Sequence, residues 1–233
     1  TSGNNLTLIG TDAGVALQNG YSCVFIGGEA GKSAVSSSNN TAIGSAAFAF
    51  NVHGRHNVAI GDGAMGAGVG PGSDTATYNV AVGGEAGKDM TTGVRNTMIG
   101  YSAAKNIESA NDTVAIGYDA GDDLTSGSSN VLIGAYTGDA LTNGDSNVAV
   151  GHNALSTEDT GDKNVAIGYE ALTALNYDGS GYNTAVGFEA GHDVSTGRYN
   201  TIVGALAGDA ITTGDSNMLF GYSAGGAITE GTR

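Results

Sequence analysis

A short phrase recurs thirteen times along this chain, and each copy ends in a glycine that follows Ile or Val in twelve of the copies. We call this residue the phrase glycine, and its copies are Gly10, Gly27, Gly44, Gly61, Gly83, Gly100, Gly117, Gly134, Gly151, Gly168, Gly187, Gly204 and Gly221. Ten of the twelve intervals between successive phrase glycines are 17 residues. A period this short indicates a solenoid, in which each repeat forms one coil and is stabilised by stacking on its neighbours. The chain therefore favours a regular scaffold over a catalytic pocket.

Composition supports a thin, layered core and excludes some partners. The chain has 41 glycines, one proline and no tryptophan, and its apolar residues are largely Ala, Val and Ile. Its formal charge is −15, and its eight Lys and Arg residues are scattered, which argues against nucleic acid and anionic membranes as partners. No apolar run is long enough to span a bilayer, so no membrane insertion is expected.

No pattern in the sequence indicates an enzyme, a metal site or a cofactor. The Gly-Asp clusters, such as 121–123, lack the nonapeptide of calcium-binding β-rolls and are interpreted as solvated turns. The stretch 83–88 reads GGEAGK but lacks the strand-to-helix context of a phosphate loop. Cys23, the only cysteine, stands where most repeats have Asn and is expected to fill that position as a buried small residue.

The positions around the phrase glycine predict a strand and a second apolar segment in each coil. Ile or Val precedes the glycine, Val or Thr stands two residues earlier, and Ala follows three residues after it. Strand alternation predicts that these side chains share one face, and that the intervening Ala, Leu or Met lies on the other. A second apolar anchor seven residues after the glycine predicts a second short strand. Thr-x-Gly turns, as at 91–93, then lead to the next coil, with glycine chosen for a positive φ.

Asn begins ten of the copies and is expected to form a ladder between stacked coils. The alanine-bearing strand face is flat and weakly polar, so it is predicted to face outward and to form the interface of a homo-oligomer. Its residues are Ala42, Ala59, Ala81, Ala115, Ala149, Ala166 and Ala185. Residues 1–233 are interpreted as one repeat domain without caps, a segment of a longer fibre.

The phrases NTAIG, NVAIGYEAL and NTAVGFEAG, with their Thr-x-Gly connectors, resemble the repeats of phage tail-fibre proteins and are similar to the head repeats of trimeric autotransporter adhesins. The resemblance covers about thirteen coils. It implies a parallel β-solenoid or β-roll, assembled as a homotrimer, that displays loops for binding a host or surface. It also implies an extracellular location, on a virion tail fibre or a cell surface. The adhesin head repeat is shorter than 17 residues, so this chain is closer to the tail-fibre type.

Two insertions interrupt the period, near 67–78 and 176–182, and irregular loops on a rigid scaffold are common binding sites. Tyrosine beside Asp and Asn suits a carbohydrate receptor, because a ring face can stack on a sugar and polar groups can bind its hydroxyls. The candidate receptor-binding residues are Pro71, Asp74, Tyr78, Asn176, Tyr177, Asp178 and Tyr182.

The expected function is therefore a non-enzymatic adhesive fibre segment, such as a phage tail-fibre shaft or tip, that attaches to a host receptor such as a polysaccharide. One alternative is a bacterial trimeric surface adhesin. A further alternative is an ice- or surface-binding solenoid, since Thr91, Thr125, Thr142, Thr212 and Thr229 share one register.

Overall fold

The computed structural model describes residues 5–66 and 75–230, and it confirms an all-β parallel solenoid with coils of about 17 residues. Among these residues there is no helix, and each coil contributes one three-residue strand. The strands are β1 (Thr7–Ile9), β2 (Val24–Ile26), β3 (Thr41–Ile43), β4 (Val58–Ile60), β5 (Val80–Val82), β6 (Thr97–Ile99), β7 (Val114–Ile116), β8 (Val131–Ile133), β9 (Val148–Val150), β10 (Val165–Ile167), β11 (Thr184–Val186), β12 (Thr201–Val203) and β13 (Met218–Phe220).

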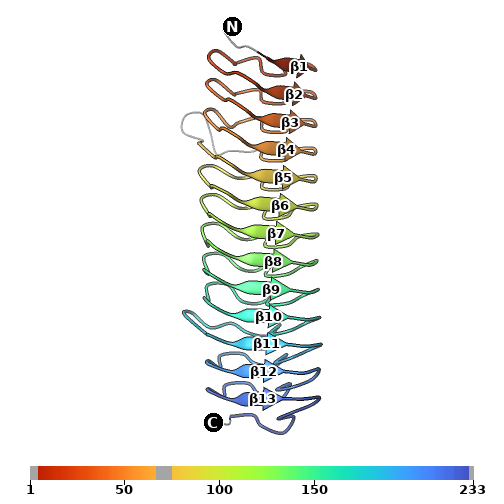
Figure 1. The fold of residues 1–233 in the computed structure, drawn as a ribbon, viewed down its shortest axis with the longest axis vertical. Helices are drawn as coiled ribbons and strands as arrows, with labels where there is room; N and C mark the ends of the chain where they lie inside the picture. The colour runs from red at the N-terminus through yellow and green to blue at the C-terminus, as the bar shows by residue number, and fades with distance from the viewer. Residues whose placement is uncertain (1–4, 67–74, 231–233) are drawn as a thin grey trace. The chain divides into compact units, whose positions relative to one another are not determined.

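The chain divides into two compact units, Thr1–Ala115 and Ile116–Arg233. In the first unit, strands β1 to β6 pair in chain order, all parallel, as the arrows of Figure 1 show. In the second unit, strands β8 to β13 pair in the same way. The register joins equivalent positions of successive repeats, for example Ala42 with Ala59, so the sequence period becomes a spatial period within each unit.

The phrase glycines are required because successive coils meet closely at this position. Gly44 has a φ of +137°, which L side chains rarely adopt. A Cβ added there would overlap the carbonyl oxygen of Gly61 in the next coil, with the carbonyl carbon only 2.6 Å away. The glycines of the Thr-x-Gly turns have a different role from the predicted one: Gly93, Gly127 and Gly144 are absent from the positive-φ residues. Close stacking explains them instead, since a Cβ at Gly127 would overlap the carbonyl oxygen of Gly144.

The core of each coil is filled by pairing large with small side chains. The residue two positions before the phrase glycine and the residue four positions after it both point inward. Phe25 at the first position accompanies Gly31 at the second, and a Cβ on Gly31 would lie 2.6 Å from the Phe25 ring. Where the first position is alanine, the second is large in some coils, as with Ala42 and Phe48, and both are fully buried. In other coils both positions are small, as with Ala81 and Gly87, and a side chain of the next coil fills the space, since a Cβ on Gly87 would lie 2.6 Å from the Met98 sulfur. This exchange of volume keeps a thin core closely packed.

The alanines predicted to face outward are in fact buried, so that prediction is wrong. Ala42, Ala59, Ala81, Ala115, Ala149, Ala166 and Ala185 all have no exposed surface in the single chain. The flanking Val or Thr and Ile or Val side chains point outward and are half-buried or exposed, as in β4. Alternation defined two faces, but the chain turns at the phrase glycine, so the alanine three residues after it does not continue the face of the residues before it. These seven alanines cannot touch a second chain.

The second predicted strand does not form in the described residues. The apolar anchors seven residues after the phrase glycine are buried, as expected, apart from the half-buried Ile228, but they lie outside any strand, directly after a turn. The β-bridges outside the named strands that the structure describes are isolated and parallel, such as Ser38 with Arg55. Other backbone hydrogen bonds join successive coils there without forming a strand, such as the N–H of Gly31 donating to the carbonyl of Ala47 at 2.9 Å. Repeated left-handed residues in each coil, such as Glu85 (φ 58°) and Tyr78 (φ 61°), bend the chain too often for a second strand to extend.

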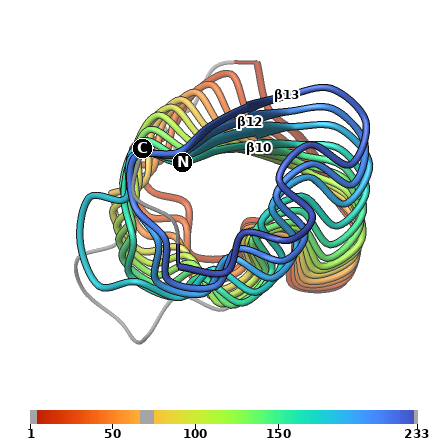
Figure 2. The ribbon, with the colours of Figure 1, turned by 90° about the horizontal axis from the view of Figure 1, so that it is seen from below.

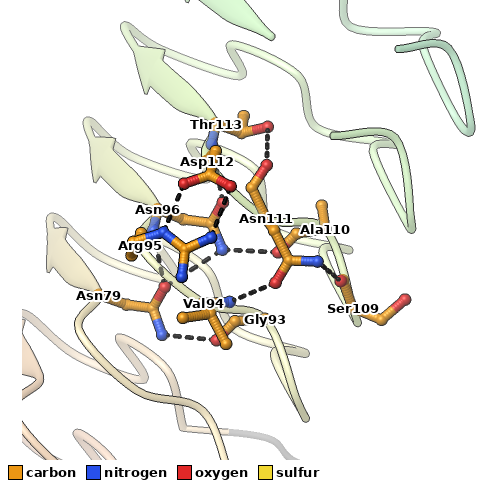
Figure 3. A network of polar contacts seen from close by, with 10 residues as sticks. All are labelled: Asn79, Gly93, Val94, Arg95, Asn96, Ser109, Ala110, Asn111, Asp112 and Thr113. Atoms are coloured by element: carbon orange, nitrogen blue, oxygen red, sulfur yellow. Dashed lines mark hydrogen bonds and ion pairs between the residues drawn. The ribbon is translucent and has the colours of Figure 1, made fainter. Parts of the chain in front are cut away.

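The predicted asparagine ladder is confirmed, and Figure 3 shows part of it. The backbone N–H of Asn96 donates to Oδ1 of Asn79 at 2.8 Å, and Nδ2 of Asn96 donates to the carbonyl of Ala110 at 2.7 Å. Asn79 makes the equivalent bond to the carbonyl of Gly93. The ladder residues are buried, so they satisfy backbone groups that water cannot reach. The Cys23 thiol takes the asparagine position in its coil and is fully buried, as predicted, and burial raises its pKa.

Candidate functional site

The loop between β10 and β11 carries the second insertion, and it extends beyond the outline of the neighbouring coils of its unit (Figure 2). Asn176 and Asp178 are exposed and bond to the preceding coil: Nδ2 of Asn176 donates to the Thr157 carbonyl at 3.1 Å, and Asp178 accepts from the Thr160 hydroxyl at 2.8 Å. The inserted residues are therefore hydrogen-bonded to the preceding coil.

The insertion brings Tyr177 and Tyr182 together with residues from other coils. The guanidinium of Arg198 lies 5.2 Å from the centre of the Tyr177 ring and 5.6 Å from that of Tyr199. The Tyr182 and Tyr199 rings are stacked, with centres 5.6 Å apart, and Nζ of Lys163 lies 5.2 Å from the Tyr182 ring centre. We call Lys163, Tyr177, Tyr182, Arg198 and Tyr199 the Arg198 cluster.

The Arg198 cluster combines aromatic surface with fixed positive charge, which is uncommon in a chain of charge −15. Arg198 is held in place because it donates to the Tyr177 hydroxyl at 3.2 Å and to Asp215 at 3.1 Å. The Asp215 carboxylate, with a smaller effect of Tyr177, raises the pKa of Arg198. Tyr182 and Tyr199 stay about half exposed, so the cluster can offer ring surface and donors to a ligand.

The first insertion is only partly described. Pro71 and Asp74 lie outside the described residues. Tyr78 is 59% exposed, and its ring stacks on His56 with the centres 4.9 Å apart.

A buried carboxylate of the preceding coil holds the second insertion in place. Glu158 occupies the position where most coils have an apolar anchor, and it has no exposed surface. It accepts hydrogen bonds from the backbone N–H groups of Gly161, at 2.7 Å, and Tyr177, at 3.2 Å. Burial raises the pKa of Glu158, although these backbone bonds oppose the shift. Glu158 therefore holds the backbone of the insertion at Tyr177, and the cost is a carboxylate removed from water.

Glu158 is expected to make stability depend on pH. Its folded pKa lies above the unfolded value of about 4.3, so its favourable contribution is complete below that value and is lost as the pH rises through the folded pKa. The unfolding free energy of the wild type minus that of Glu158→Gln should therefore fall as the pH rises above about 4. Denaturant titrations of both proteins at several pH values measure this difference. A difference that is constant or rises with pH would contradict the assignment.

Two groups of outward residues escaped the sequence analysis. The first is a β-branched face, made by the Val or Thr and the Ile or Val that flank each inward residue of a strand, such as Ile43, Ile60, Ile99 and Ile167. The second is a row of rings on the second unit, which we call the aromatic row: Tyr118, Tyr136, His152, Tyr169 and Phe188. The spacing of Tyr118, His152 and Tyr169, each directly after a phrase glycine, was the available signal.

Within 5–66 and 75–230, no group of three or more His, Cys, Asp or Glu side chains is placed to hold a metal ion. Asp139 is half-buried, and burial, with a smaller effect of the nearby Asp123 and Asp119, raises its pKa. No helix of membrane-spanning length and hydropathy occurs in the part of the chain that the structure describes.

Comparisons with models of known protein families, with curated proteins and with solved structures found no match to this chain.

Proposed function

We propose that this chain is a segment of an adhesive fibre that attaches a virion or a cell to a host surface. The observation that carries the proposal is the Arg198 cluster, in which rings and cations from three successive coils are fixed beside the inserted loop. A repeat scaffold fixes such a group with little loss of entropy on binding, which favours recognition of a surface. The phage tail-fibre type is the form suggested by the repeat phrases, and a bacterial trimeric adhesin is the alternative. Both place the chain outside the cell.

The Arg198 cluster is expected to be needed for attachment. The double variant Arg198→Ala/Tyr199→Ala should bind immobilised bacterial surface polysaccharides at least about tenfold more weakly, because it removes a ring and its cationic neighbour. Surface plasmon resonance over a panel of such polysaccharides measures the loss. Arg95→Ala is the matched control, since Arg95 is an exposed arginine paired with Asp112 in the first unit. Equal effects of both variants would contradict the assignment, and so would a wild type that binds no member of the panel.

We further propose that copies of the chain associate through the β-branched face, and the repeat phrases suggest three copies. Its side chains are apolar except for the threonines, recur from strand to strand in each unit, and leave large groups such as Ile60 in contact with water. Contiguous exposed apolar surface of this kind usually marks an interface. The buried alanines are replaced in this role by their outward neighbours.

Association through the β-branched face can be tested by placing charged side chains on it. Ile43→Lys/Ile60→Lys places two lysines on adjacent strands and should convert the oligomer to monomers, because an apolar contact would have to bury unpaired charges. Light scattering gives the mass, and X-ray scattering of the same sample gives the shape. Thr92→Lys, in an exposed turn, is the control. A monomeric wild type, or a double variant of unchanged mass, would contradict the proposal.

The contacts of the threonines that share one register argue against the ice-binding alternative. The hydroxyls of Thr91, Thr125 and Thr142 donate to carbonyls of the next coil at 3.0, 3.1 and 2.9 Å. Hydroxyl protons used within the chain are not available to order water, so adhesion remains the proposal that we favour.

A further inference from the structure

The aromatic row is a regular feature of the second unit that the Arg198 cluster does not include. Neighbouring ring centres are separated by 5.4, 5.8, 5.5 and 5.2 Å along the order Tyr118, Tyr136, His152, Tyr169, Phe188. The four rings other than His152 are between 39% and 50% exposed, and His152 is also exposed. Each of these five coils thus presents one ring to solvent, at nearly constant spacing.

The rings remain accessible although they contact one another. The planes of Tyr169 and Phe188 are within 8° of parallel, yet their centres are 5.2 Å apart. Carbon atoms in contact are separated by about 3.5–4.0 Å, so rings whose centres are 5.2 Å apart are not in close face-to-face contact, and both remain about half exposed. The Tyr136 ring lies at 66° and 76° to its two neighbours, which breaks the stack at this coil.

Polar acceptors accompany the rings. In four coils the residue two positions after the phrase glycine carries a carboxylate or an amide. These residues are Asp119, Asn153, Glu170 and Glu189. These side chains are half-buried. The neighbouring Glu170 carboxylate raises the pKa of Tyr169. Apolar ring surface beside hydroxyl-binding acceptors is what a sugar needs, because a pyranose has an apolar face and a rim of hydroxyl donors.

We propose that the aromatic row binds an extended neutral glycan along the coil stack, with about one sugar residue for each coil. The repeat of the rings matches the length of one pyranose residue in an equatorially linked chain, so successive sugars meet successive rings in the same register. Charge selects among glycans: three of the four accompanying acceptors are carboxylates and the chain carries −15, so a uronic acid polymer would be repelled. The inference rests on the proposed adhesive function and names the chemistry of a second ligand surface.

Titration calorimetry of the full chain with neutral β-1,4-linked glucose oligosaccharides tests this proposal. Affinity should rise with oligosaccharide length through at least five residues, because the row offers five rings. Tyr169→Ala should weaken binding of the hexasaccharide about fivefold, which corresponds to one aromatic contact. Tyr136→Ala/Tyr169→Ala/Phe188→Ala should abolish it. Tyr21→Ala removes an equally exposed ring from the first unit and should leave binding unchanged.

Circular dichroism of each variant separates loss of binding from loss of fold. The proposal is overturned if no neutral oligosaccharide binds, if the folded triple variant binds as the wild type does, or if an oligogalacturonate binds more tightly. A triple variant that changes the mass in light scattering, with no sugar bound by the wild type, would make the row a contact between copies and would also overturn it. Polysaccharide binding that needs Arg198 without oligosaccharide binding would overturn only this inference. The reverse result would overturn only the proposed function of the Arg198 cluster.

Discussion

Gly44→Ala is expected to destabilise the first unit by about 4 kcal/mol, since a strained φ and an overpacked contact each cost about 1–3 kcal/mol. Gly44 has a φ of +137°, and a new Cβ would overlap the backbone of Gly61 in the next coil. That backbone is itself fixed by strand pairing with the following coil, so it cannot move aside without breaking further hydrogen bonds. The effect should appear as a lower midpoint in denaturant unfolding followed by circular dichroism.

Gly28→Ala is the matched control, because Gly28 is exposed and a Cβ there would meet nothing within 4 Å. Its stability should stay within about 1 kcal/mol of the wild type or rise slightly, since alanine restricts the unfolded chain. Similar midpoints for the two variants would contradict the close stacking of the coils at the phrase glycine.

Asn57→Leu is expected to cost about 3–5 kcal/mol, because each buried group left without a partner costs about 1–3 kcal/mol. Nδ2 of Asn57 donates to the carbonyl of Ala76 at 2.8 Å, and its Oδ1 accepts from the backbone N–H of Asn79 at 2.9 Å. Leucine has nearly the same size but neither group, so the buried N–H of Asn79 would lose its partner, and Nδ2 of Asn79 would lose one of its two acceptors. The Ala76 carbonyl would keep only its longer bond from the N–H of Arg55, at 3.3 Å. Hydrogen exchange at the Asn79 amide, together with the unfolding midpoint, measures the loss.

The same substitution at an exposed asparagine controls for the change of residue type. Oδ1 of Asn143 accepts from the side chains of Ser126 and Thr125 at the surface, where water can replace the amide. Asn143→Leu should therefore cost less than about 1 kcal/mol. If Asn57→Leu cost no more than this control, the ladder would be a consequence of stacking and not a cause of stability.

Much of the fold follows from the repeat, because a strict period places equivalent residues above one another. The phrase glycines, the ladder asparagines and the buried anchors could all be assigned in this way. The direction of the strand faces could not, since Ala59 and Ile60 are both apolar and only the turn at Gly61 decides which one points inward. The balance of volumes between Ala42 and Phe48 contained that information.

The candidate site was predictable only in part. The inserted Tyr177 and Tyr182 could be selected from the break in the period, because irregular loops stand out against a repeat. Arg198 and Tyr199 lie in the next coil, and nothing in the sequence distinguishes them. Only the structure shows that Arg198 lies against the rings of Tyr177 and Tyr199. Glu158 was visible as an acid among apolar anchors, and this exception to the repeat is the signal that would have identified the support of the loop.

The contacts at the phrase glycine and at the ladder asparagine both run from one coil to the next in the same direction. Asn40 accepts from Asn57, and Gly44 meets Gly61. Each coil therefore has a donor side and an acceptor side that fit any neighbour of the same type, provided that the inward side chains match in volume. A gene for such a chain can gain or lose material by unequal recombination in steps of one 17-residue repeat and keep every joint intact. A residue added between the ladder asparagine and the phrase glycine would misalign the two contacts. Residues added between one phrase glycine and the next asparagine leave them intact, since the bonds from Asn79 to Asn57 and from Asn183 to Asn164 span 22 and 19 residues. Selection on length therefore acts on the short segment from asparagine to glycine and tolerates insertions elsewhere in the coil.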